Sequence, residues 1–299
     1  MIEEVGALDM GSKNVKFVGG HRVNGRIVTR LIDKMALNLG RAIAANEGVI
    51  PRQKLLEIGS TISVCQEYCR RHGMTQLLAI ATHAINQAQN KAEVVALCRN
   101  HGIELEVVDG PREAKIGYLA ATGGEPNCLV CELGSHSCQI AWQTEDQIQS
   151  CCIPKGYIGA YMEFIRQARN FSQARADYRA FLDKTIVGLP QDTHRLIALA
   201  ANSLTGFVLE QGKDQGGSLP QSALINKIWQ LDALASKRFE ALKRNTFKID
   251  KLLAGLIFME YLLEHSGHDQ VEVTRVELPT GLIVEYYQDR IADPVPPPC

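Results

Sequence analysis

The segment Asp9-Met10-Gly11-Ser12-Lys13-Asn14 contains residue types that could bind a phosphorylated ligand. It joins two apolar segments, so a tight turn here would present backbone N–H groups and hydroxyl, amine and amide donors beside one carboxylate. These groups suit a phosphate and a divalent cation. The alternative is an ordinary hairpin in which Gly11 supplies a positive φ and Asp9 hydrogen-bonds the turn.

A second segment, Glu132-Leu133-Gly134-Ser135-His136-Ser137, repeats the order acid, apolar, Gly, Ser. Two facing turns of this kind can hold a phosphate chain in a cleft between two lobes. His136 could contact phosphate or act as an acid, although a histidine in a Gly/Ser turn can equally be a solvated loop residue.

A third candidate is Asp109-Gly110-Pro111-Arg112-Glu113, at a predicted strand-to-helix junction. Helix capping alone would explain both acids and is the simpler interpretation of these residues. The functional alternative is that Glu113 projects toward the strand ends, where open α/β sheets bind ligands, and deprotonates an attacking water.

The remaining polar candidates have simple structural explanations. Four histidines lie at predicted helix ends or between elements, namely His83, His101, His265 and His268. A basic stretch is most simply a solvated face, although a polyanion could also bind there; it comprises Lys243, Arg244, Lys248 and Lys251. The sequence has no HExxH, GxxxxGK or GxSxG motif. Cys128 and Cys131 have CxxC spacing but lie on a predicted strand, where positions three apart face opposite sides and cannot share a metal.

These candidate residues are positioned by alternating strands and helices. We expect strands at 2–8, 14–18, 26–32, 77–81 and 103–108, and helices at 52–72, 91–99 and 113–121. The helix at 52–72 is predicted from apolar residues at helical spacing and ends at Gly73. The alternation favours an α/β layer with parallel strands.

After a break at 122–127 the opening pattern starts again. We expect strands at 129–132, 137–143 and 147–153, a helix at 159–168, helices at 192–209, 221–242 and 248–264, a strand at 271–277 and a helix after Gly281. We expect a polar loop at residues 212–219 and an extended tail at 293–299. The repeat predicts two related lobes, residues 1–124 and residues 125–299 with added helices.

Composition excludes several classes of protein. The chain has 299 residues, 45% of them apolar and 22% charged, with 32 Lys and Arg against 33 Asp and Glu. These proportions are globular, and the near-neutral charge argues against a nucleic-acid or membrane binder. The acidic N-terminus differs from a signal peptide, and the apolar run 254–263 is too short to span a bilayer. Nine scattered cysteines read as reduced thiols, so we expect a cytoplasmic protein.

Taken together, these segments resemble the exopolyphosphatase / guanosine pentaphosphate phosphohydrolase (Ppx/GppA) family, a branch of the actin-like, sugar-kinase and Hsp70 ATPase superfamily. The similarity extends over AlDmGSkNvkfv at the start, IATHAINQAQN and GIELEVVDGPREAKIGYLA, LVCELGSHSCQI, and FKIDKLLAGLIFMEYLL with VELPTGLIVEYY near the end. It implies two ribonuclease-H-like lobes with polyphosphate or a phosphorylated guanosine nucleotide bound in the interlobe cleft.

The resemblance also implies roles for individual residues. Glu113 occupies the place of the catalytic glutamate and would activate water. Asp9 and Glu132 would hold Mg²⁺ or another divalent cation. The phosphate would be bound by two loops, formed by Gly11, Ser12, Lys13 and Asn14 and by Gly134, Ser135, His136 and Ser137.

The chain differs from the family at several positions. The second loop in the family usually has three glycines and a later glutamate, where this chain has Ser135, His136 and Gln139. Two family arginines are replaced by Asn38 and Asn86, and a Gly-Gly-Thr-like segment is replaced by 201–203.

Three functions follow from this comparison. The first is a phosphatase that cleaves a phosphoanhydride bond in polyphosphate or guanosine pentaphosphate. The second is a catalytically impaired member that binds a phosphorylated ligand or a partner protein. The third is an ATP-dependent kinase or activator, for which 201–203 offers no evident adenosine loop. Because family members often pair, we also expect a homodimer.

Overall fold

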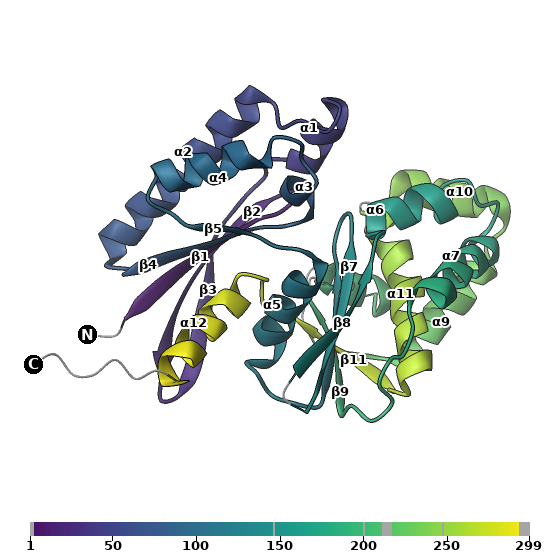
Figure 1. Ribbon diagram of the computed structural model, residues 1–299. Coiled ribbons are helices and arrows are strands. Elements are labelled where there is room, and N and C mark those ends of the chain that lie inside the picture. The colour runs from purple at the N-terminus through teal and green to yellow at the C-terminus, as the bar shows by residue number, and fades with distance from the viewer. Residues whose placement is uncertain (1–2, 146, 200, 211–216, 247, 293–299) are drawn as a thin grey trace, which may run out of the picture. The chain divides into compact units, whose positions relative to one another are not determined.

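The computed structural model describes residues 3–145, 147–199, 201–210, 217–246 and 248–292. The chain divides into two units, shown in Figure 1. One unit contains the residues up to Gly124 and those from Glu277 onward, and the other is Glu125–Val276. The sequence had suggested that residues 125–299 form one lobe. The part from Glu277 belongs instead to the first unit, because its helix packs on the first sheet.

The first unit is built on a five-stranded sheet of order β3-β2-β1-β4-β5. Its strands are β1 (Glu4–Met10), β2 (Val15–Val23), β3 (Arg26–Met35), β4 (Gln76–Ala81) and β5 (Leu105–Val107). The first three form an antiparallel meander, whereas β4 and β5 run parallel to β1. The carboxyl ends of β1, β4 and β5 therefore meet at one edge of the sheet.

Six helices cover the two faces of this sheet (Figure 1). They are α1 (Leu39–Ala45), α2 (Arg52–His72), α3 (His83–Asn86), α4 (Lys91–Asn100), α5 (Gly110–Thr122) and α12 (Thr280–Ala292). Leu8 and Met10 of β1 belong to the core beneath α1 to α4. Val5 and Ala7 belong to the core shared with α5 and α12. Because side chains alternate along a strand, Asp9 lies on the α5 and α12 face.

Helix α2 has the bounds predicted from its apolar spacing. Gly73 follows it with φ 68°, the left-handed conformation that glycine adopts at low cost, and its N–H donates to Arg70 and Cys69 carbonyls. One face buries Ile58, Ile62 and Cys65 against the sheet. The helix end is thus encoded locally.

The second unit repeats the topology of the first. Its strands are β6 (Cys128–Leu133), β7 (Cys138–Thr144), β8 (Gln147–Ile153), β9 (Arg195–Leu199), β10 (Gly217–Pro220) and β11 (Gln270–Thr274). The order β8-β7-β6-β9-β11 has the same sequence of pairings as β3-β2-β1-β4-β5, with β10 added at the edge. The predicted α/β fold with two related lobes is confirmed.

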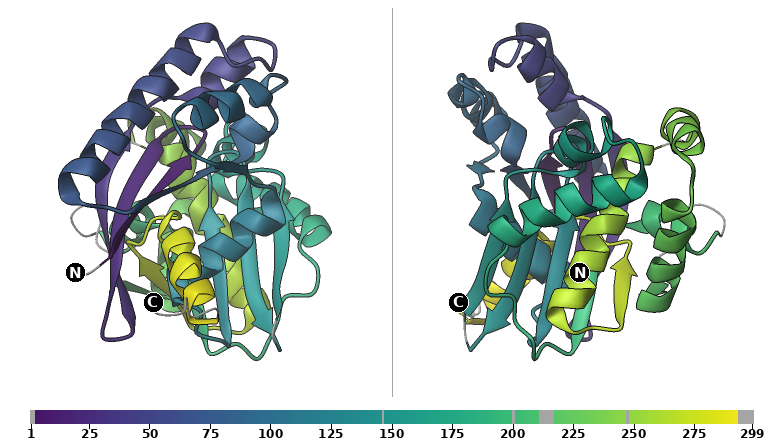
Figure 2. Two further views of the ribbon diagram at one scale, coloured as in Figure 1. Left: turned by 60° about the vertical axis from the view of Figure 1, so that its left-hand side comes forward. Right: turned by 90° about the vertical axis from the view of Figure 1, so that its right-hand side faces the viewer.

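Helices of the second unit pack on one face of its sheet, as both views of Figure 2 show. They are α6 (Tyr157–Ala160), the π-helix η1 (Tyr161–Ile165), α7 (Phe171–Thr185), α8 (Asn202–Val208), α9 (Gln221–Asp232), α10 (Ser236–Asn245) and α11 (Ile249–Ser266). The almost wholly buried α11 contacts α7 and α9 and lies over Leu129, Cys131 and Leu133 of β6.

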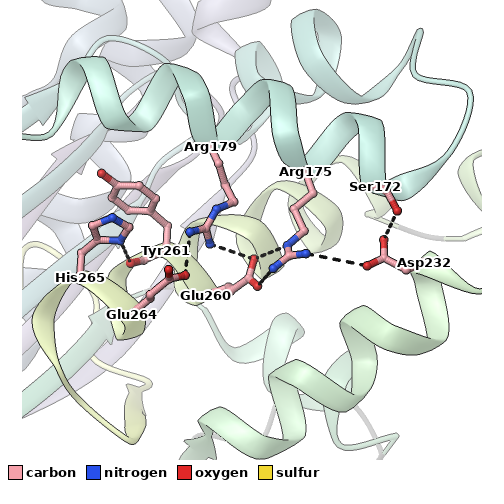
Figure 3. A network of polar contacts seen from close by, with 8 residues as sticks. All are labelled: Ser172, Arg175, Arg179, Asp232, Glu260, Tyr261, Glu264 and His265. Carbon is pink, nitrogen blue, oxygen red and sulfur yellow. Dashed lines mark hydrogen bonds and ion pairs between the residues drawn. The ribbon is translucent and has the colours of Figure 1, made fainter.

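A chain of charged side chains joins α7, α9 and α11 (Figure 3). Arg175 binds both oxygens of Glu260, and Arg179 Nη1 lies 3.4 Å from Glu260 Oε2. Arg175 also approaches Asp232 at 3.8 Å, and Arg179 pairs with Glu264 at 2.6 Å. Glu260 is only 9% exposed, so both arginines offset the cost of its burial.

Two helices predicted for the second unit were wrong, and one helix was missed. The helix expected at 192–209 is strand β9 followed by the short α8, because an apolar run does not distinguish a buried strand from a buried helix. The helix expected at 221–242 is broken between Asp232 and Ser236 into α9 and α10. Helix α7 was not predicted. The loop expected at 212–219 ends in β10 and otherwise lies outside the described residues, as does the tail 293–299.

Candidate functional site

The first candidate loop, Gly11 to Asn14, connects β1 and β2 and is held from behind by the start of α1. The N–H of Gly11 donates to the Asn14 carbonyl at 3.1 Å, which closes the turn. The carbonyls of Ser12 and Lys13 accept from the N–H groups of Gly40 and Asn38, each at 2.8 Å. The loop is therefore fixed through its carbonyl groups.

Gly11 does not supply the positive φ of an ordinary hairpin, since no positive φ occurs there. Its role is steric. A Cβ at this position would lie 3.1 Å from the Asn14 carbonyl oxygen and 3.7 Å from Asp9 Oδ1. A glycine thus allows the turn to close against the carboxylate.

Asp9 is a buried carboxylate, 3% exposed, at the end of β1. Its cross-strand partner is Lys16, whose Nζ lies 3.7 Å from Oδ2. Oδ1 is buried and has no hydrogen-bond partner in the described structure. Burial raises the pKa of Asp9 above its ordinary value, and the Lys16 charge only partly offsets that effect.

Glu277, from the C-terminal segment of the first unit, completes this cluster. Its Oε2 lies 2.8 Å from Lys16 Nζ, and its Oε1 lies 3.4 Å from Lys34 Nζ. Although burial opposes its ionisation, the charges of Lys16 and Lys34 hold the pKa of Glu277 below the ordinary value. Acidic and basic side chains therefore alternate along this cluster, in the order Asp9, Lys16, Glu277 and Lys34.

Glu113 lies in the first turn of α5, which follows β5 at the same sheet edge. Asp109 caps this helix, its Oδ1 accepting from the Arg112 N–H at 2.9 Å, so the capping role is confirmed for Asp109. Glu113 is 9% exposed, unlike a purely capping acid at a solvated helix end. Hydrogen bonds from Thr82 N–H to the Met10 carbonyl and from Val108 N–H to the Ala81 carbonyl link the three strand ends.

The second candidate loop, Gly134 to Ser137, is held in the same manner by the start of α6. The carbonyls of Gly134 and Ser135 accept from the N–H groups of Tyr157 and Ile158 at 3.0 and 3.1 Å. A Cβ on Gly156 would collide with the backbone of all three residues from 134 to 136, and a Cβ on Gly134 would collide with the Ser137 carbonyl. Each unit thus has a loop fixed by N–H groups near the start of a helix.

Glu132 and Gln139 occupy in the second unit the places of Asp9 and Lys16 in the first. They are cross-strand partners in β6 and β7, seven residues apart like the first pair. Gln139 is 3% exposed, and its Nε2 donates to Ser137 Oγ at 2.9 Å. The amide therefore supports the loop at Ser137 as a donor, whereas an ionised glutamate could bind the same hydroxyl only as an acceptor.

Asn38 and Asn86, where the family resemblance led us to expect arginines, have structural roles. Asn38 adopts φ 51° at the start of α1, a conformation that asparagine tolerates better than most residues. Asn86 donates from Nδ2 to the Val108 carbonyl at 3.1 Å, beside the start of α5. Residues 201–203 lie at the junction between β9 and α8.

The basic stretch is not simply a solvated face. Lys243 is 8% exposed, and its Nζ donates to the carbonyls of Arg166 and Ala168 at 2.8 and 3.1 Å. It therefore supplies hydrogen-bond donors to carbonyl groups just after the helical segment α6–η1. Lys248 precedes α11 with φ 56°, and Lys251 Nζ lies 5.7 Å from the centre of the Tyr157 ring.

Among the other candidates, His101 caps the end of α4, as expected. His265 hydrogen-bonds the Tyr261 carbonyl at 2.8 Å within α11. Cys131 lies on the helix-covered face of β6 whereas Cys128 does not, as the strand alternation predicted. The cysteines in the described part of the chain are free thiols.

The described residues contain no group of three or more His, Cys, Asp and Glu side chains that could hold a metal ion by themselves. Asp9 nevertheless offers a buried oxygen with no hydrogen-bond partner, an orphaned acceptor that a cation would satisfy. Because Mg²⁺ commonly takes one or two carboxylates and completes its shell with water and phosphate, this residue fits the ion.

Sequence reasoning missed Lys16 and Glu277. A signal for Lys16 was present, since a four-residue turn from Gly11 to Asn14 places Asp9 opposite Lys16 on the returning strand. Glu277 lies 261 residues beyond Lys16 and no local spacing points to it.

Within the described residues, no helix is both long and apolar enough to cross a membrane.

Known proteins resemble this chain in sequence and in fold. Exopolyphosphatase 1 of Mycobacterium tuberculosis (strain ATCC 25618 / H37Rv) and that of Mycobacterium bovis are each 30% identical over 119 residues. This match covers 39% of the chain and about a third, 34%, of each relative.

Two solved structures cover nearly the whole chain. The Aquifex aeolicus member of the Ppx/GppA family is 19% identical, covers 97% of this chain and 99% of its own, and has a TM-score of 0.82. An exopolyphosphatase from Cytophaga hutchinsonii is 19% identical, covers 96% and 98%, and has a TM-score of 0.73. Structural similarity at this level of sequence identity shows the fold alone, which is an α/β fold of two ribonuclease-H-like lobes.

The family itself is shown by a model described as the Ppx/GppA phosphatase family, which matches residues 18–289. Since that match spans most of the sequence, this chain belongs to the Ppx/GppA phosphatase family.

Proposed function

We propose that this chain is a phosphatase that hydrolyses a phosphoanhydride bond in inorganic polyphosphate or guanosine pentaphosphate. One observation supports this most: a buried carboxylate, Asp9, lies beside a backbone-fixed loop at the sheet edge where α5 begins, with Glu113 in its first turn. This combination offers a cation ligand, donors for phosphate oxygens and a carboxylate for water.

Each group has a defined task in this proposal. Glu113 accepts the proton of the attacking water as it approaches the terminal phosphorus. The donors of the loop Gly11 to Asn14 bind phosphoryl oxygens and stabilise their growing charge. The loop Gly134 to Ser137 gives the second unit equivalent donors. Asp9 would hold Mg²⁺, which would supply positive charge that offsets that of the phosphate.

The direct test is phosphate release from long-chain polyphosphate, guanosine pentaphosphate and ATP, each with Mg²⁺ and with a chelator. Turnover of one of the first two, dependent on Mg²⁺, supports the proposal and identifies the substrate. Formation of ADP only when an acceptor is present would instead indicate a kinase. Absence of phosphate release from all three contradicts the hydrolase.

A second candidate, a catalytically impaired phosphate-binding or partner-binding member, is favoured by Gln139. This buried amide donates to Ser137 where the family resemblance leads us to expect a carboxylate. An impaired binder would be stabilised thermally by polyphosphate without turning it over, since a ligand of the folded state raises its stability. Gln139→Glu would then raise phosphate release from background, whereas in an active enzyme it would not.

A further inference from the structure

Lys16 is placed so that it could pair with either of two carboxylates. It is the cross-strand partner of Asp9, which is the position in which opposite charges on neighbouring strands pair most closely. The observed geometry favours the other carboxylate: Nζ lies 2.8 Å from Glu277 and 3.7 Å from Asp9. The shorter distance is that of a full charge-assisted hydrogen bond, and the longer one is not.

Glu277 is held firmly in this position by its own segment. Its carbonyl accepts from the Thr280 N–H at 3.0 Å, and the next residue, Leu278, is 2% exposed in the core beneath α12. Lys34, opposite Lys16 on β3, approaches the second oxygen of Glu277 at 3.4 Å. The side chain of Glu277 therefore lies between two lysines.

This arrangement has a consequence for Asp9. Only its Oδ2 faces Lys16, at the longer distance, while Oδ1 is buried with no hydrogen-bond partner in the described structure. A buried carboxylate oxygen without a partner is costly unless a cation or donor satisfies it. An ammonium group at full contact with Asp9 would compete with such a cation.

On the proposed function, in which Asp9 binds a divalent cation, we propose that Glu277 is a positioning residue that draws Lys16 away from Asp9 and so keeps the carboxylate available to that cation. Without the charge of Glu277, Lys16 closes on Asp9 and occupies it. Loss of a residue that orients a metal ligand typically weakens metal binding by about ten- to a hundredfold. We expect a weakening of at least about tenfold in Glu277→Gln.

The test uses Mn²⁺, which shares the oxygen-ligand preference of Mg²⁺. Free Mn²⁺ is followed by electron paramagnetic resonance during titration of the full chain, with no substrate present. The proteins are wild type, Asp9→Asn, Glu277→Gln, Lys16→Met and the double variant Lys16→Met/Glu277→Gln. Glu285→Gln is the matched control, because Glu285 lies in the same segment but pairs with Arg112 and Lys115. Thermal unfolding confirms that each variant folds.

We expect wild type and Glu285→Gln to bind Mn²⁺ equally and Asp9→Asn to lose the site. Glu277→Gln should bind at least about tenfold more weakly, and removal of Lys16 in the double variant should restore most of that loss. Wild-type affinity in Glu277→Gln, or an equal loss with and without Lys16, would overturn the proposal.

The same titration separates this inference from the proposed function. If wild type releases phosphate but shows no Mn²⁺ site that depends on Asp9, the role of Glu277 is wrong and the phosphatase stands. If the Mn²⁺ results are as expected but no substrate is hydrolysed, the role of Glu277 stands and the phosphatase is wrong.

Discussion

Lys16 Nζ lies 3.7 Å from Asp9 Oδ2, across the two strands that flank the first loop. In the second unit the equivalent partners are Glu132 and Gln139, with the same seven-residue spacing. A lysine in one unit thus corresponds to an amide in the other. The two loops share their backbone support and differ in the charge beside them.

The burial of the Asp9 carboxylate predicts that Asp9→Asn keeps or gains stability while it loses activity. Because burial raises its pKa in the folded state, the protonated form is favoured on folding. Keeping Asp9 ionised in the folded protein therefore costs free energy at neutral pH. That cost disappears as the pH falls below the pKa of an aspartate in the unfolded chain. Asp9→Asn should be at least as stable as wild type near about pH 7 and lose this advantage near about pH 4, while its phosphate release falls.

Urea unfolding at both pH values, with a chelator present, measures this difference. Asp289→Asn, at an exposed position on α12, serves as the control and should follow wild type at each pH. Lower stability of Asp9→Asn at neutral pH would show that the carboxylate stabilises the fold instead.

Gly156 should be essential to the second loop. Its backbone is extended, with φ −82° and ψ −173°, so alanine is allowed conformationally and only the collision with the loop backbone opposes it. We expect Gly156→Ala to cost about 1–3 kcal/mol in the free energy of unfolding and to weaken phosphate binding.

Gly159→Ala, three residues along the same helical segment, is the control for that change. There a Cβ would lie 3.6 Å from the Lys155 Cβ, an ordinary contact. The control should be neutral or more stable by about 0.5–1 kcal/mol. Equal behaviour of the two variants in chemical denaturation would refute the steric argument.

Glu260 should be the most sensitive residue of the charged network between α7, α9 and α11. Replacing it by Gln leaves Arg175 and Arg179 without their shared carboxylate in a half-buried site. We expect Glu260→Gln to cost about 3 kcal/mol, the lower end for breaking a buried pair, because Arg175 is a third exposed.

Glu264→Gln removes a carboxylate that is 56% exposed from the same network. Its cost should stay below about 1 kcal/mol. Denaturant midpoints at low and high salt would test both values. A similar cost for Glu260 and Glu264 would mean that burial does not decide the strength of these pairs.

The elements with strong local signals were predictable from the sequence. Helix α2 has both an apolar stripe and a glycine at its end. The repeated order of elements after residues 122–127, together with the acid-Gly-Ser turn, predicted the duplicated sheet. Strand β9 was not predictable, because its buried apolar run has no periodicity that distinguishes a strand from a helix.

The candidate site was predictable in part for a related reason. Each loop is a continuous segment that closely follows an acidic residue in the sequence, Asp9 or Glu132, and Glu113 was found through the family resemblance. Glu277 could not be found, because its place beside Lys16 depends on α12 returning to the first sheet. The burial of Lys243 was likewise hidden: its pairing with Glu240 is local, but its bonds to the carbonyls of Arg166 and Ala168 have no sequence signature.

The catalytic role proposed for Glu113 has a matched control in Glu93. Glu93 occupies the first turn of α4 as Glu113 does that of α5, but it is exposed and hydrogen-bonds Asn90 at its own helix start. Glu93→Gln therefore reports what loss of an acid at a helix start does by itself.

The most direct test is phosphate release with Mg²⁺ from long-chain polyphosphate and guanosine pentaphosphate, compared for wild type, Glu113→Gln and Glu93→Gln. We predict that wild type and Glu93→Gln turn over the same substrate, whereas kcat falls by about 10²–10⁴-fold in Glu113→Gln, the scale of a lost general base. Turnover by Glu113→Gln at the wild-type rate would show that Glu113 is not the general base.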